Sequence, residues 1–175
     1  MKPEIQLSSK TVFDGKLLHV TYDTVQVENG NEAWREVVRH PGAVAILAVL
    51  PDGKIIMERQ YRYAIGDTLL EIPAGKLDEG EGPLAAAKRE LHEETGYGAE
   101  DWKKLGSIVT SPGFCDEVIH IFLATGLEKG EQQLDEDEFV EVLACSLEEL
   151  EGKIATGELF DGKTIAGLMM AKPYL

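Results

Sequence analysis

Cysteines and long apolar runs are scarce in this chain of 175 residues, and each scarcity excludes a class of protein. With only Cys115 and Cys145, the chain is no disulfide scaffold, and a reducing compartment is expected. The longest apolar run, residues 43–50, is too short to span a bilayer, and the N-terminal stretch MKPEIQLSSK contains no apolar signal core. We therefore expect a soluble, cytoplasmic protein without a membrane partner.

Basic residues are also scarce, with 17 Lys and Arg against 32 Asp and Glu and a formal net charge of −15. Binding to nucleic acid or to an anionic membrane needs clustered Lys and Arg, so this balance argues against both kinds of partner. A negatively charged ligand must then be met by local arginines or by a bound cation. A chain this acidic attracts cations.

Strand patterns fill the N-terminal part of the chain. The expected strands are residues 4–13, 17–28 and 33–39, and Asn29-Gly30 is a hairpin signal because both residues accept a positive φ. Because a three-stranded sheet of this size is marginal alone, we expect it to pack on the main domain or on a second subunit. The expected organisation is a small antiparallel sheet in residues 1–41 and a larger domain in residues 42–175.

The larger domain alternates strands and helices. Its continuous apolar run from Ala43 to Leu50 is typical of a strand buried on both faces. Ser146 to Glu149 forms a capping box and Asp161 can cap a last helix, so two helices are expected near the C-terminus. The expected strands are residues 43–50, 54–62, 68–72, 104–110, 118–125 and 139–145, and the expected helices are 83–95, 147–156 and 162–172. Helices around mixed strands make the fold class α/β or α+β.

One helix, from Pro83 to Thr95, carries the candidate site. Proline suits the first helical position, where its missing N–H has no partner to lose, and Gly96 can end the helix in a left-handed conformation. At about 100° per residue, the expected buried stripe is Leu84, Ala87 and Leu91.

Three glutamates of this helix, Glu90, Glu93 and Glu94, share an adjoining arc about 100° wide. Repulsion between the first and the last costs roughly 0.2–0.5 kcal/mol, and carboxylates at the negative end of the helix dipole cost about 0.3–1 kcal/mol each. A hard divalent cation such as Mg²⁺ or Mn²⁺ would remove the conflict. The alternative is a solvated acidic face with Lys88 and Arg89 as counter-charges, and spacing alone leaves both open.

The wider pattern around the helix resembles a known signature. The pattern begins at Gly75, reaches Glu81 after five residues, and after seven more continues as Arg89-Glu90-Leu91-x-Glu93-Glu94-x-Gly96. It resembles the complete signature of the Nudix hydrolases, which cleave nucleoside diphosphates linked to another group. Tyr97 departs from it, at a packing position where the family usually has an aliphatic residue. The resemblance implies the Nudix α/β/α sandwich with a mixed sheet for the larger domain. It also implies Mg²⁺ as cofactor, with Mn²⁺ as a substitute.

Three further stretches resemble the ADP-ribose pyrophosphatase branch of that family. Pro112 lies 16 positions after Gly96, Arg59 to Arg62 precede the signature, and the stretch LDEDEF at residues 134–139 follows it. This resemblance implies Mg²⁺-dependent hydrolysis of ADP-ribose to AMP and ribose 5-phosphate by a homodimer that shares or exchanges its N-terminal sheet. The alternatives are hydrolysis of another nucleotide sugar or of a nucleoside triphosphate, and a non-catalytic domain that binds ADP-ribose.

The resemblance also implies roles for single residues. The cation is expected to be held by the backbone carbonyl of Ala74 and by the side chains of Glu90, Glu93, Glu94 and Glu138. Arg89 is expected to orient these glutamates, with Glu81 behind it. Substrate contacts are expected from Arg35, Arg62, Pro112, Gly113 and Glu117, with Arg62 at the pyrophosphate. Glu136 is the expected general base, with Glu93 and Glu117 as competitors.

Overall fold

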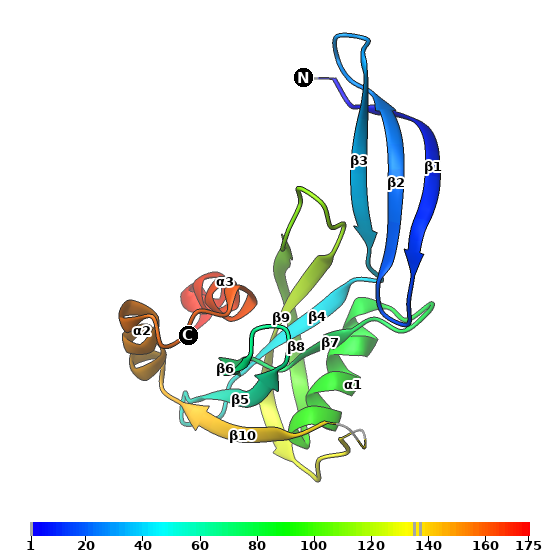
Figure 1. Cartoon of the computed structure of the whole chain (residues 1–175). Helices are drawn as coiled ribbons and strands as arrows, with labels where there is room; N and C mark the ends of the chain where they lie inside the picture. Colours follow the sequence, from blue (N-terminus) through cyan, green and yellow to red (C-terminus); the bar gives the residue numbers. More distant parts are fainter. Residues whose placement is uncertain (1, 135, 137) are drawn as a thin grey trace. The chain divides into compact units, whose positions relative to one another are not determined.

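The structure is a computed structural model that describes residues 2–134, 136 and 138–175 (Figure 1). The chain forms two compact units. The first consists of the chain up to Gly42 together with Val109–Val118, and the second of Ala43–Ile108 and Ile119–Leu175. None of the helices that the structure describes is long and apolar enough to cross a membrane.

The first unit is built on an antiparallel sheet of β1 (Ile5–Asp14), β2 (His19–Gln26) and β3 (Glu32–Arg39), in the order β1-β2-β3. The expected strands are confirmed to within a few residues. The β2–β3 hairpin turns through Gly30, whose φ of 88° lies in the left-handed region that glycine adopts without strain. All ten residues of β1 are exposed, which leaves this edge strand uncovered in the single chain.

The stretch 109–118 is tied to the end of β3. The amide of Val38 donates to the carbonyl of Phe114 over 2.7 Å, and the amide of Asp116 donates to the carbonyl of Val38 over 3.2 Å. Arg39 links two carboxylates across this junction, donating to the buried Asp23 over 2.7 Å and to Asp116 over 3.2 Å.

The second unit contains two sheets. In the first, β7 (Ala74–Lys76) pairs with β4 (Ala43–Ala48), which runs parallel to β9 (Val118–Lys129), with β8 (Tyr97–Val109) at the far edge. In the second, β5 (Ile55–Arg62) lies between β10 (Val140–Cys145) and β6 (Asp67–Glu71), and both neighbours are antiparallel to it. The mixed sheet and the α+β class are therefore confirmed.

Strand β4 explains how the core is divided. Its six residues are buried, as the apolar run predicts, and they alternate between two apolar clusters. Ala45 and Leu47 join the cluster that contains Leu168 of α3 (Gly162–Ala171), whereas Val44 and Ile46 join the cluster that contains Leu91 of α1 (Pro83–Thr95). The two-residue period of a strand thus sends successive side chains to opposite helical layers.

The three helices begin and end where their capping residues predict. Gly96 has φ 75° and its amide donates to the carbonyl of His92, which closes α1. At the start of α2 (Leu147–Thr156), Ser146 and Glu149 form the expected reciprocal capping box. Asp161 accepts from the amide of Thr164 at the start of α3, and a short 3₁₀ turn, Lys172–Tyr174, follows that helix.

Three local expectations were wrong. Leu84 is 43% exposed rather than buried, because side chains of a first turn tilt past the start of the helix; Ala86, Ala87 and Leu91 form the stripe instead. Strand β8 begins directly after Gly96, seven residues earlier than expected. The short strand β7 was missing from the expected strands, since three residues after Pro73 carry no strand period.

Candidate active site

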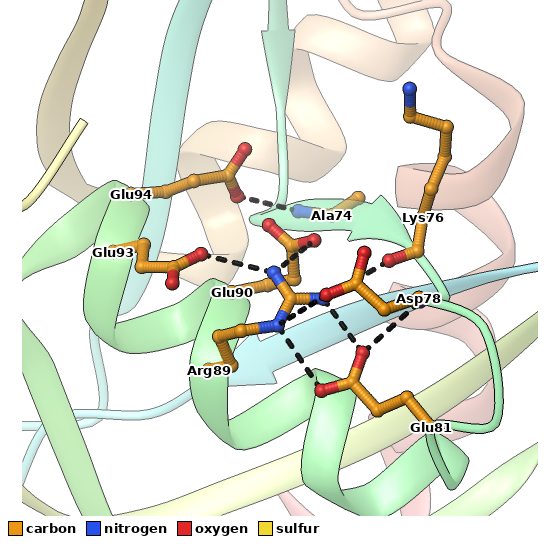
Figure 2. Close-up of polar contacts among 8 residues, drawn as sticks. All are labelled: Ala74, Lys76, Asp78, Glu81, Arg89, Glu90, Glu93 and Glu94. Atoms are coloured by element: carbon orange, nitrogen blue, oxygen red, sulfur yellow. Dashed lines mark hydrogen bonds and ion pairs between the residues drawn. The ribbon is translucent and has the colours of Figure 1, made fainter. Parts of the chain in front are cut away.

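Arg89 lies among Glu81, which precedes α1, and the glutamates Glu90 and Glu93 of α1 (Figure 2). It donates to both carboxylate oxygens of Glu81, over 3.1 and 2.8 Å, and to the carboxylates of Glu90 over 2.8 Å and Glu93 over 3.0 Å. A fifth bond reaches the carbonyl of Lys76 over 3.2 Å. The hydrogen bond with Glu81, and then those with Glu90 and Glu93, raise the pKa of Arg89. A planar guanidinium with several fixed donors can orient three carboxylates at once, which an ammonium cannot do.

Glu81 is held from its other side as well. The amide of Asp78 donates to Glu81 over 3.2 Å, so the loop before α1 and the side chain of Arg89 share this carboxylate. Hydrogen bonding by Arg89 keeps the pKa of Glu81 below its usual range. Glu81 therefore remains ionised and anchors Arg89 to the loop.

Gly75 makes room for Glu90. A Cβ atom at this glycine would lie 1.9 Å from Cδ and 2.0 Å from Oε1 of Glu90. The carboxylate therefore sits directly against the backbone of β7. The glycine of the signature is required here for close approach rather than for an unusual backbone angle.

Glu94 is the most deeply buried glutamate of the helix, at 4% exposed. Its carboxylate accepts a hydrogen bond of 2.9 Å from the amide of Ala74, so the helix and β7 meet at this pair (Figure 2). Burial, then the charges of Glu58 and Glu90, raise the pKa of Glu94 to about 9.

Glu58 on β5 is a further carboxylate at the site, and sequence reasoning missed it. It is 3% exposed, and its Oε1 has no hydrogen-bond partner among the described residues. Burial, then the charge of Glu71, raise its pKa to about 8, and Glu138 adds to this effect. The signal available in the sequence was a lone glutamate directly after the apolar run Ile55 to Met57. A glutamate at that position predicts the start of the solvent-exposed part of a strand.

These carboxylates fit a divalent cation in their chemistry. Glu58 and Glu94 are buried, one oxygen of Glu58 has no hydrogen-bond partner among the described residues, and hard cations such as Mg²⁺ take carboxylate oxygens as ligands. Within the described part of the chain, however, no three acidic, histidine or cysteine side chains are gathered as a closed ligand set. Arg89 engages Glu90 and Glu93 instead.

Arg62, expected at the pyrophosphate, forms a two-point ion pair with Glu71 on the neighbouring strand, with distances of 2.8 and 2.9 Å. Lys163, at the start of α3, contacts the same carboxylate and lies 3.2 Å from Asp161. The buried Thr164 beside it accepts from the amide of Ile72 over 2.9 Å. This polar network joins α3 to the segment that leads into Ala74.

Glu136 is exposed and Glu138 is partly buried. Glu138 acts electrostatically on Glu90 and Glu94, raising the pKa of both carboxyls as a smaller contribution. The chain just before these residues is hydrogen-bonded to the end of α1. The side-chain amide of Gln132 donates to the carbonyl of Glu94 over 2.6 Å, and the backbone amide of Gln133 donates to the carbonyl of Glu93 over 2.9 Å.

The other expected substrate residues lie in the first unit. Arg35 pairs with Glu4, and Glu117 accepts from the hydroxyl of Thr110 over 2.7 Å. Gly113 lines a pocket of about 560 Å³ with Trp34 and Phe114, both of which expose more than half of their surface. Pro112, next to Gly113, belongs to the same loop.

Comparison with known proteins identifies the family. The NUDIX domain matches residues 39–168 of the chain. The chain is 47% identical to an ADP-ribose pyrophosphatase of Bacillus subtilis (92% of this chain, 88% of the relative) and 44% identical to a methanol dehydrogenase activator of Bacillus methanolicus (93% and 89%). It is 39% identical to an ADP-ribose pyrophosphatase of Mycobacterium tuberculosis (93% and 80%).

A solved structure of an ADP compounds hydrolase shares the fold, with a TM-score of 0.87 at 24% identity over 100% of this chain and 95% of that one. The family match covers far more than half of the chain and includes every glutamate that surrounds Arg89. This chain is therefore a member of the Nudix hydrolase family.

Proposed function

We propose that this protein hydrolyses the pyrophosphate of ADP-ribose to AMP and ribose 5-phosphate, with Mg²⁺ as its cofactor. The observation that carries the proposal is the group of carboxylates on and beside α1: Glu58 and Glu94 are buried, and one oxygen of Glu58 has no hydrogen-bond partner among the described residues. Two relatives of 47% and 39% identity are named ADP-ribose pyrophosphatase, and they are similar over more than nine tenths of this chain.

The residues that would hold the cation are Glu90, Glu94, Glu138 and the backbone of Ala74, with Glu93 beside them. A bound divalent cation neutralises the charge on phosphate oxygens and makes water a better nucleophile at neutral pH. Arg89 holds Glu90 and Glu93 in fixed orientations, because its guanidinium is itself fixed by two bonds to Glu81.

Glu136 is the proposed general base. Its carboxylate is exposed, so it is free to meet a substrate-bound water, whereas Glu93 is already bonded to Arg89. The base accepts the proton of the attacking water while that water adds to one phosphorus of the pyrophosphate. The bond from this phosphorus to the bridging oxygen breaks, and the leaving phosphate carries the bridging oxygen away.

Arg35, Gly113 and Glu117 are proposed to contact the substrate from the first unit. The pocket beside Arg35 and Gly113 presents the exposed ring of Trp34, which is 60% exposed and stacks on Tyr22 at 6.3 Å between ring centroids. An aromatic face supported from behind in this way suits a nucleobase. Arg62 is proposed to keep a role at the pyrophosphate through its position beside Glu71.

We further propose that the protein is a homodimer formed through its first unit, which contains the N-terminal sheet expected in residues 1–41. Strand β1 is exposed along its whole length and carries Ile5, Leu7, Val12 and Phe13, each about half exposed. An uncovered edge strand with large apolar side chains is a surface that a second copy can cover. Light scattering at micromolar concentration tests this, and a monomeric mass would contradict it.

The function is tested by product release from ADP-ribose, ADP-mannose, GDP-mannose and deoxynucleoside triphosphates, each with Mg²⁺ and with EDTA. We expect ADP-ribose to lead in kcat/KM by about tenfold or more, a difference of about 1.4 kcal/mol, and EDTA to abolish the reaction. GDP-mannose is the sharpest competitor, because a relative of 36% identity from Yersinia enterocolitica is named GDP-mannose pyrophosphatase. A different leading substrate would refute the proposed specificity, and no cleavage of any compound would favour a binding domain.

A further inference from the structure

Glu58 faces the helix that carries the signature glutamates. Residues two apart on a strand share a face, and Ile56, two positions before Glu58, packs in the apolar cluster that contains Leu91 of α1. Val142, directly opposite Glu58 on β10, packs against the same cluster. The carboxylate of Glu58 therefore points to the layer in which α1 lies, and not to solvent.

The cations whose charge acts on Glu58 form their hydrogen bonds with another carboxylate. Arg62 and Lys163 act on Glu58 through their charge, but their hydrogen bonds go to Glu71. One oxygen of Glu58 has no hydrogen-bond partner in the described part of the chain, although the residue is 3% exposed. A buried carboxylate oxygen without a hydrogen-bond partner destabilises the fold. We therefore expect this oxygen of Glu58 to contact a ligand.

Glu58 acts electrostatically on Glu94 and is acted on by Glu138, so these three carboxylates belong to one cluster. Given the proposed function, Glu94 and Glu138 are ligands of the divalent cation. We propose that Glu58 is a further carboxylate ligand of this cation, contributed by β5 from the side opposite the signature helix. The site would then draw ligands from β5 as well as from α1 and the chain before β10.

A different arrangement can also relieve the repulsion between Glu58 and Glu94, namely one proton shared by the two carboxyls. The two arrangements differ in what a neutral side chain at position 58 would do. If Glu58 is a ligand, removing its charge weakens cation binding. If the pair serves only to share a proton, the cation loses nothing when Glu58 becomes an amide.

The experiment is calorimetric titration of Mn²⁺ alone into the whole protein at one fixed pH, for the wild type, Glu58→Gln and Glu141→Gln. Glutamine keeps the shape of the side chain and removes its charge. Glu141 is the matched control: it lies on β10 next to Val142, its side chain is 67% exposed, and it pairs with Arg59 over 3.4 Å. Both variants change the net charge of the protein by the same amount.

We expect Glu58→Gln to weaken Mn²⁺ binding by about tenfold or more, since even residues that only support a metal ligand contribute that much, and Glu141→Gln to bind as the wild type does. Equal affinity of Glu58→Gln and the wild type would overturn the proposal, and so would an equal weakening in both variants, which would reflect net charge alone. Circular dichroism and thermal unfolding in EDTA establish that Glu58→Gln is folded.

The same titration separates this inference from the proposed function. A wild-type protein that binds Mn²⁺ but does not cleave ADP-ribose would refute the substrate and leave the role of Glu58 open to the same comparison of variants. Conversely, a protein that cleaves ADP-ribose with unchanged Mn²⁺ affinity in Glu58→Gln would retain the function and lose the inference.

Discussion

Replacing Gly75 with alanine is the sharpest test of the site geometry. The new Cβ atom would lie 1.9 Å from Cδ of Glu90, whereas ordinary contact begins near 3.4 Å, so the carboxylate must move by at least 3.4 − 1.9 = 1.5 Å. Displacement of a catalytic group by about 1 Å costs on the order of 10²-fold in rate. We therefore expect Gly75→Ala to lower kcat by about 10²-fold or more.

The stability of this variant should change little. The backbone of Gly75 is not in the left-handed region, so alanine fits its conformation, and the atoms that must give way are the end of a flexible side chain. Replacing glycine at a compatible position gains roughly 0.4–1 kcal/mol from the unfolded chain. This gain offsets part of the loss of the bond from Arg89 to Glu90, which is 2.8 Å long.

The assay is hydrolysis of ADP-ribose with saturating Mg²⁺, together with thermal unfolding of the same samples. Gly98→Ala is the control, because it lies in strand β8 and a Cβ there meets nothing within 4 Å. A Gly75→Ala enzyme that turns over like the wild type would refute the placement of Glu90 against β7. An unfolded Gly75→Ala protein would refute the prediction that this substitution lowers kcat with little change in stability.

Three further variants test other parts of the site. Glu136→Gln should lower kcat by on the order of 10²-fold or more with substrate affinity retained; an unchanged kcat would move the base to Glu93 or Glu117. Arg89→Lys should lower both activity and the free energy of unfolding, the latter by about 1–3 kcal/mol, because lysine cannot replace several charged hydrogen bonds at once; urea unfolding equal to the wild type would contradict this. Burial raises the pKa of Glu71, but bonds from Arg62 and Lys163 outweigh burial and hold it below its ordinary value of 4.5. This pairing therefore stabilises the fold above that pH and is lost as the pH falls through the folded-state pKa, so Glu71→Gln should flatten the acid side of the stability profile measured by urea unfolding.

Local patterns were sufficient for most of the secondary structure. The bounds of α1 follow from Pro83 and Gly96, and the start of α2 follows from its capping box, because both depend on hydrogen bonds between near neighbours in the chain. The same holds for the buried strand β4, whose apolar run needs no other information. Strand β7 could not be found in this way, since its three residues become a strand only by pairing with β4.

The candidate site shows the same division. The spacing of Gly75, Glu81 and the glutamates of α1 was enough to predict the family, because a signature is a property of the chain alone. It did not show that Gly75 is required by contact with Glu90, since the two residues meet only when β7 packs beside the helix. Arg62 was assigned to the pyrophosphate, and its pairing with Glu71 depends on the register of β5 and β6.

The sequence by itself thus determined the family, the helix that carries the carboxylates and the caps that end it, because each of these rests on residues close together in the chain. Only the tertiary structure decided which carboxylates share the interior. Glu58 is separated from Glu94 by more than thirty residues, and its charge matters because β5 brings it under α1, where no described cation pairs with it. Burial is a property of the packed molecule, and so is the need for a ligand that burial creates.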